Sequence, residues 1–218
     1  MKTRCIFLAF CLLSVSLYAQ TGIAPGALEN LEALLNKPTV VRPAASAAAS
    51  ERNWYSVDID THMFTDEASF RQVVSVLTDV ENYGSIFDGR STKLRTSIVS
   101  RGYNTVIADI TSITVAFIRF TIKYRASVSV LENGRTVFTS EVQQIDNDSN
   151  REIRNYHSIR HVEEVTVNGK KYIYIRIGSQ SENHIGIRLS NITNTIERNS
   201  VSSNEDTLKM IIDAAKGR

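Results

Sequence analysis

The stretch that decides the fold is residues 116–130, which read AFIRFTIKYRASVSV. Apolar and polar side chains alternate along it, which is the period of a β-strand with one buried face. The apolar face carries Ala116, Ile118, Phe120, Ile122, Tyr124, Ala126, Val128 and Val130. The opposite face carries Arg119, Thr121, Lys123, Arg125 and Ser127. The pattern predicts a sheet with one face turned toward the core and the other toward solvent.

Further strands extend the sheet on either side of this stretch. Asn133-Gly134 and Asn168-Gly169 are dipeptides that favour the tight turns of β-hairpins. Runs with β-branched and aromatic side chains flank these turns. The seven expected strands cover residues 55–60, 93–99, 103–110, 115–131, 135–145, 156–167 and 171–178. Because six of them follow one another directly, we expect a strongly curved antiparallel sheet.

Helical spacing appears after the first strand and again at the C-terminus. Apolar residues in 70–77 fall on one helix face, and residues 80–87 continue as a second short helix. Residues 208–215 repeat the apolar stripe, and such a helix can cover the open side of a curved sheet. Serine and asparagine, which are poor helix formers, crowd residues 191–204, so the continuity of the C-terminal helix stays open. The sequence predicts an α+β fold.

The N-terminus has the three parts of a secretory signal peptide over residues 1–19. Lys2 and Arg4 precede an apolar run from residue 5 to 17, and Ala19 offers a small residue for cleavage. We expect an extracytoplasmic protein, periplasmic or secreted. An uncleaved anchor is the first alternative, but the run is shorter than the 20 or so residues of a membrane span. Lipidation at Cys11 is the second, although the bulky Phe10 precedes that cysteine.

Cleavage would change both the charge and the thiol content of the chain. Cys5 and Cys11 are its two cysteines, and Lys2 and Arg4 account for its net charge of +2. The mature protein would therefore be neutral and free of disulfides. A neutral protein lacks the basic field that nucleic acids attract, so we expect no nucleic-acid partner and at most transient membrane contact. Residues 20–52 contain Ala, Ser, Pro and Gly and are interpreted as a flexible linker before a domain at 53–218.

Residues 70–83, FRQVVSVLTDVENY, resemble the first helix of the START-like superfamily, in which an apolar helix leads to an Asp and then an aromatic residue. Residues 93–99 are similar to the strand that follows in that superfamily, which also includes polyketide cyclases and lipid-transport proteins. The resemblance covers about residues 53–216. It implies a helix-grip fold, with the sheet wrapped around the C-terminal helix. It also implies a cavity for a lipid-like, hydrophobic or amphipathic molecule.

The resemblance and the strand pattern together select the residues expected to bind this ligand. They are Tyr83, Ile118, Phe120, Ile122, Tyr124, Phe138, Val142, His161, Ile173, Ile175, Ile211 and Ile212. Tyr124 or His161 would orient the ligand by hydrogen bonding. A filled core without a cavity is the alternative. The function that we expect is an exported, monomeric binding protein.

No motif assigns a catalytic residue, a cofactor or a metal. His157 and His161 lie about 13 Å apart on a regular strand, which is too far to share one zinc ion. Asp146, Asp148 and Asn150 begin like a calcium loop, but Arg151 stands where that loop needs glycine. A cyclase or dehydrase on the same fold, as in some START-like proteins, remains a competing hypothesis. So does a filled-core protein that meets a partner through Arg119, Lys123 and Arg125.

Overall fold

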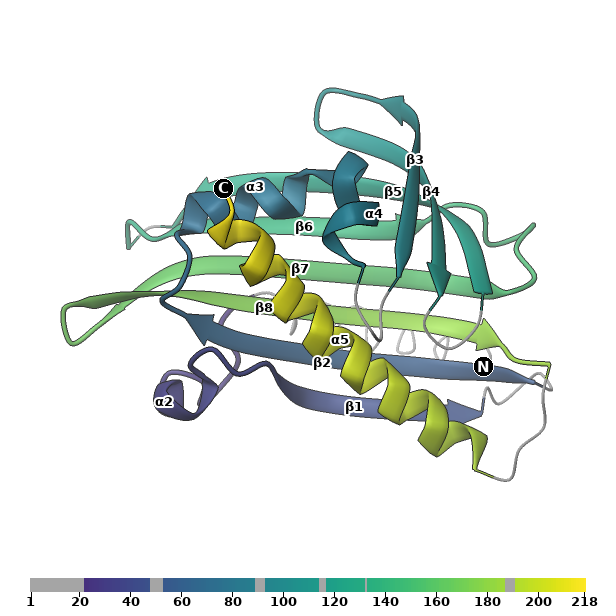
Figure 1. The fold of residues 1–218 in the computed structure, drawn as a ribbon, viewed down its shortest axis with the longest axis horizontal. Coiled ribbons are helices and arrows are strands. Elements are labelled where there is room, and N and C mark those ends of the chain that lie inside the picture. Colours follow the sequence, from purple (N-terminus) through teal and green to yellow (C-terminus); the bar gives the residue numbers. More distant parts are fainter. Residues whose placement is uncertain (1–21, 48–52, 89–92, 114–116, 132, 187–190) are drawn as a thin grey trace, which may run out of the picture.

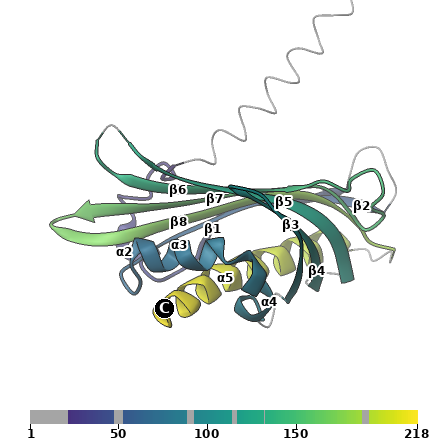
Figure 2. The same cartoon turned by 90° about the horizontal axis from the view of Figure 1, so that it is seen from above.

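The described residues of the computed structural model are 22–47, 53–88, 93–113, 117–131, 133–186 and 191–218 (Figure 1). They form one antiparallel sheet, and the helices that follow residue 69 pack against its concave face (Figure 2). The expected signal peptide at residues 1–19 lies outside these residues, as do residues 20–21 and 48–52 of the expected linker. Export therefore stays a prediction.

The sheet has eight strands among the described residues, one more than the sequence predicted. They are β1 (Thr39–Ala47), β2 (Trp54–Thr65), β3 (Leu94–Arg101), β4 (Thr105–Ile113), β5 (Phe117–Val130), β6 (Thr136–Gln144), β7 (Ile153–Val167) and β8 (Lys170–His184). Their order across the sheet is β1-β2-β8-β7-β6-β5-β4-β3, so β3 and β1 form its edges. The chain thus runs as a meander from β3 to β8, and β8 then pairs with β2.

The extra strand, β1, comes from the segment expected to be a flexible linker. It pairs with β2 from Thr39 opposite His62 to Ala47 opposite Tyr55. Pro43 lies inside β1, and proline is tolerated there because an edge strand has one side without a hydrogen-bonding partner. The folded domain consequently begins well before residue 53.

The helices are α2 (Leu31–Leu34), α3 (Phe70–Thr78), the 3₁₀ turn η1 (Val80–Asn82), α4 (Tyr83–Ile86) and α5 (Ile192–Lys216). The two short helices expected after the first predicted strand are α3 and η1–α4. The C-terminal helix α5 is continuous over 25 residues, which settles the question that the sequence left open. It crosses in front of β1 and β2 and ends beside α3 (Figure 1). No helix of the described residues has the length and apolar character that a membrane crossing requires.

The main core fills one half of the space between the sheet and the helices. Leu208, Ile211, Ile212 and Ala215 on the C-terminal half of α5 are buried in the same cluster as Leu77 of α3. Phe138, Ile173 and Ile175 line the sheet side of this cluster. The C-terminal half of α5 thus packs into the main core, and its N-terminal half is anchored by Ile196, which is buried against Val57 and Ile59 of β2.

A second layer covers part of the convex face. Ala24, Ala27, Leu31 and Leu34 of the N-terminal segment pack against Phe64, Val165 and Tyr174 of the sheet. The amide of Gly22 donates to Nδ1 of His161, and the amide of Ala24 donates to the hydroxyl of Tyr174. Strands β2, β7 and β8 are therefore buried on both faces where this segment covers them.

A buried ion pair lies beside this segment. Nε of Arg176 on β8 donates to both carboxylate oxygens of Asp60 on β2, at 2.9 and 3.1 Å. The two side chains are only 7% and 4% exposed. Removing one partner of an ion pair at this depth leaves the other charge buried without a counter-ion, which lowers the free energy of unfolding by about 3–5 kcal/mol.

We expect Asp60→Asn to lower the free energy of unfolding by about 3 kcal/mol, because Arg176 would keep its charge without a counter-ion. Urea unfolding measures this change. Asp88→Asn is the control, since Asp88 forms an exposed pair with Lys93 at 3.5 Å, and removing it should cost less than about 1 kcal/mol. Equal losses in the two variants would contradict the interpretation.

Two buried histidines on the convex face predict acid sensitivity. Burial lowers the pKa of His62 and of His161 below the ordinary value of 6.5. The unfolded chain therefore binds protons more readily than the folded protein, so stability should fall as the pH drops below about 6.5. His62→Gln combined with His161→Gln should make this fall shallower, as followed by thermal unfolding between pH 7 and 5. His184→Gln, at an exposed position, should leave the slope of the native protein unchanged.

Candidate ligand-binding cavity

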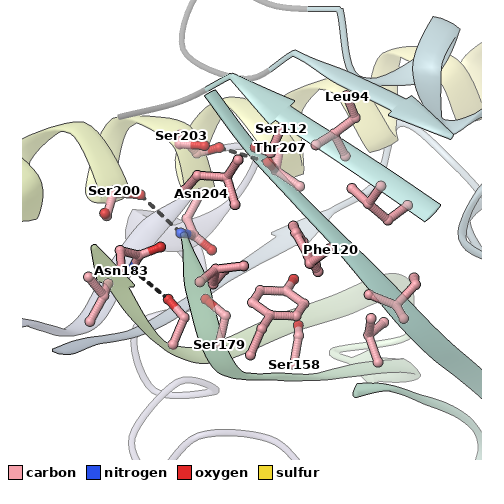
Figure 3. A pocket seen from close by; sticks show the side chains of 18 of the residues that line it. Leu94, Ser112, Phe120, Ser158, Ser179, Asn183, Ser200, Ser203, Asn204 and Thr207 are labelled. Atoms are coloured by element: carbon pink, nitrogen blue, oxygen red, sulfur yellow. Dashed lines mark hydrogen bonds between the residues drawn. The ribbon is translucent and has the colours of Figure 1, made fainter. Parts of the chain in front are cut away.

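The other half of the space between sheet and helices is hollow. A cavity of about 190 Å³ lies between the N-terminal half of α5 and the concave face of the sheet (Figure 3). Its apolar wall comes mainly from β3 to β6 and the end of α4. This wall is formed by Phe87, Leu94, Ile110, Ile118, Phe120, Ile122 and Val142. The lining on β8 runs from Ile177 to Asn183, about 20 Å at the rise of a β-strand, so the cavity is elongated.

Small polar side chains line the cavity on the helix and along β8. They come from α5 and β8 and comprise Ser200, Ser203, Asn204, Thr207, Ser179, Ser181 and Asn183 (Figure 3). Two of them bond to the helix backbone, Asn204 to the carbonyl of Ser200 at 2.9 Å and Thr207 to that of Ser203 at 2.7 Å. Those on α5 are too small to reach across to the sheet. Three of the residues that made α5 look weak as a helix, Ser200, Ser203 and Asn204, thus line the cavity and leave it open.

A buried cation lies at the β7 side of the cavity. Arg160 is 8% exposed and lines the cavity together with Tyr156 and Ser158 of the same strand. One guanidinium nitrogen, Nη1, donates to the hydroxyl of Tyr83, which in turn donates to the carbonyl of Leu77. The guanidinium carbon also lies 5.2 Å from the centre of the Tyr83 ring. These contacts fix Arg160 in place, with a tyrosine as its hydrogen-bond acceptor.

Tyr83 and Tyr124, whose hydroxyls both donate to the carbonyl of Leu77, stay protonated. Burial raises the pKa of Tyr83, and the guanidinium of Arg160 offsets only part of that effect. Burial also raises the pKa of Tyr124, whose hydroxyl donates to the carbonyl of Leu77 at 2.9 Å. Neither phenol supplies a negative charge to Arg160 near neutral pH.

The twelve residues expected to bind ligand fall into three places. Five of them line the cavity: Tyr83, Ile118, Phe120, Ile122 and Val142. Six lie in the packed core next to it: Tyr124, Phe138, Ile173, Ile175, Ile211 and Ile212. The twelfth, His161, lies neither in the cavity nor in the packed core beside it. The structure thus brings eleven of the twelve to the concave face, and their contact with a ligand stays a prediction.

His161 was expected in the pocket wall and is instead on the convex face. It pairs in register with Arg176, and its Nε2 lies 3.0 Å from Oε2 of Glu163, beneath the N-terminal segment. The cavity side of β7 carries the alternate residues, among them Arg160. Sequence reasoning missed Arg160, because both faces of β7 are buried here and neither one shows a clean apolar alternation. The strand register would have found it, because Val162 lies opposite Ile175, which was expected in the pocket, and Arg160 is two residues from Val162 on the same face.

The two histidines considered for zinc binding interact with different carboxylates. Nε2 of His157 lies 2.9 Å from a carboxylate oxygen of Glu141, whereas His161 meets Glu163. No group of three potential metal ligands comes together within the described residues. In the polar loop, Asp146 accepts hydrogen bonds from Gln144 and Asn150, which closes a turn.

Comparison with known proteins identifies the type of fold. No family profile and no curated protein sequence matches the chain. Human STARD10 is similar in structure, with a TM-score of 0.50 and 11% identity over 78% of this chain and 72% of that one. A protein of Thermus thermophilus matches at 0.49 with 12% identity, over 72% of this chain and 96% of its own. The STAR-related lipid transfer protein of Xanthomonas axonopodis matches at 0.47 with 11% identity, over 78% and 98%. The chain has the START-like helix-grip fold.

Proposed function

We propose that the protein is an exported carrier that holds a hydrophobic or amphipathic small molecule in the cavity beneath the N-terminal half of α5. The observation that carries this proposal is the cavity itself, which has one apolar wall and one wall of small polar side chains. A concave site with a largely apolar lining and a few polar groups is a natural site for a hydrophobic or amphipathic ligand. The START-like fold that the chain shares with STARD10 supports a lipid-like ligand.

The size of the cavity limits the ligand. Its volume of about 190 Å³ is below the range of about 300–1,000 Å³ that is typical for drug-sized ligands. The elongated shape and the modest volume favour a single chain or a narrow ring system over a two-chain lipid. Each 100 Å² of apolar ligand surface that is buried would contribute about 2.5 kcal/mol to binding.

The lining favours carriage over acid–base catalysis. Among the described residues that line the cavity there is no histidine, aspartate, glutamate or lysine. The titratable groups present are the tyrosines and Arg160, and burial keeps Tyr83 protonated at neutral pH. A cyclase or dehydrase would need a group that exchanges protons near the working pH. A filled-core interaction protein would not need the cavity.

Blocking the cavity tests this function. Ser179→Phe would place an aromatic ring into the space beside the polar wall. We expect the affinity for the uncharged probe Nile red, followed by its fluorescence, to fall at least tenfold. Ser97→Phe, at an exposed position on β3, should bind the probe within twofold of the native protein. Native mass spectrometry of the unmodified protein should also show a co-purified small molecule. Equal probe binding by both variants would count against a cavity site.

Export is tested by the mature mass. When the full chain is expressed in a bacterium with a working export pathway, we expect an intact mass that lacks residues 1–19. The protein should appear in the extracytoplasmic fraction, because residues 1–19 have the pattern of a cleaved signal. A chain that lacks residues 2–19 should stay in the cytoplasm. Recovery of the uncleaved full chain from the cytoplasm would overturn the proposed export.

A further inference from the structure

Arg160 is a buried cation whose charge no carboxylate balances within the described residues. Its recorded hydrogen bond goes to the neutral hydroxyl of Tyr83. The other buried arginine on the neighbouring strand, Arg176, differs in this respect, because Asp60 neutralises it through two oxygens. A guanidinium stays protonated in proteins, so Arg160 cannot escape the cost of burial by losing its proton.

Two acidic side chains on neighbouring parts of the chain are engaged elsewhere. Asp79 follows α3 and accepts a hydrogen bond from Arg218 at 2.5 Å. Glu163 is on the same strand as Arg160 but on the convex face, where it pairs with Arg135 at 2.6 Å. Neither carboxylate is available to Arg160 without breaking an ion pair. Within the described residues, Arg160 therefore lines the cavity without a carboxylate partner.

The guanidinium of Arg160 also has N–H donors beyond the one that bonds to Tyr83. It carries five N–H groups in a planar fork, and the one recorded hydrogen bond uses a single nitrogen, Nη1. Such a fork matches the two oxygens of a carboxylate or a phosphate, and these charge-assisted bonds are strong where water is scarce. Ser158 and Tyr156 lie on the cavity face of the same strand and add hydroxyl groups nearby.

We propose that the ligand is an amphipathic anion, with a carboxylate or phosphate head group seated on Arg160 and an apolar tail along Phe120 and Ile122. This inference rests on the proposed carrier function and names the chemical class of its ligand. The head group supplies the negative charge that the protein itself does not place beside Arg160. The hydroxyl and amide groups of Ser179, Ser181 and Asn183 carry no charge, so they suit neutral polar parts of the ligand.

A matched series of single-chain ligands tests the head group. Dodecanoic acid, dodecyl phosphate and dodecanol share one tail and differ in charge. Their dissociation constants are measured by displacement of Nile red from the full mature protein at neutral pH. We expect dodecanol to bind at least tenfold more weakly than the preferred anion. The comparison of the two anions shows whether Arg160 selects a carboxylate or a phosphate.

Variants of Arg160 separate charge from packing. Arg160→Gln should weaken binding of the preferred anion tenfold to a hundredfold and change dodecanol binding less than threefold. Arg160→Lys keeps the charge but lacks the planar fork, so its affinity for the preferred anion should lie between those of the native protein and of Arg160→Gln. Arg125→Gln removes an exposed cation from β5 and should leave all three affinities unchanged. Circular dichroism and thermal unfolding verify that each variant is folded.

The outcomes distinguish this inference from the carrier function. If dodecanol binds as tightly as both anions, the anionic head group is wrong and the carrier function stands. If none of the three ligands binds and Nile red does not bind either, the carrier function fails as well. Should Arg160→Gln not fold, the comparison of acid, phosphate and alcohol on the native protein decides the question alone.

Discussion

The structure depends on a single helix, α5, that must cover the concave face of a strongly curved sheet. Its C-terminal half does so with large apolar side chains, Leu208, Ile211 and Ile212, which are buried with those of α3 and the sheet. Its N-terminal half carries small polar side chains toward the same face, and the space beneath them stays open. An unfilled apolar space costs stability, so the helix is held in place by its packed C-terminal half and, at the other end, by Ile196 against β2. The division of one helix into a packed half and an open half creates the cavity.

The distribution of charge follows a similar division. On the convex face the buried charges are balanced locally, as in the pair of Asp60 with Arg176. The N-terminal segment lies over this face and contributes backbone hydrogen bonds at Gly22 and Ala24. On the concave face Arg160 has a tyrosine as its partner, and it lines the cavity. A protein interior tolerates such a cation at a substantial cost, which makes the wall around Arg160 electrostatically suited to an anion.

Much of the fold could be predicted, because strand β5 and the helices α3 and α5 each have one dominant apolar face. In β5 the convex face carries exposed arginines, so the alternation of Ile118, Phe120 and Ile122 with polar residues shows the buried side directly. The cavity was predicted only in part. Arg160 was missed because β7 is covered on both faces, and a shift of one residue along a strand moves every side chain to the opposite face. The serine and asparagine residues of α5 were interpreted as a possible break in the helix.

The sequence by itself determined the α+β class, the hairpins, the long inward-facing strand and the likeness to START-like proteins, since these rest on local periodicity and turn residues. Tertiary structure decided three other features. The Ala- and Pro-containing segment forms the edge strand β1, because β2 offers it hydrogen-bonding partners, and its composition alone does not predict this pairing. Tertiary structure made α5 continuous, because anchoring at Leu208 and Ile196 outweighs the weak propensity between them. It also turned Arg160 rather than His161 toward the cavity, because register across β6, β7 and β8 fixes which face each side chain takes.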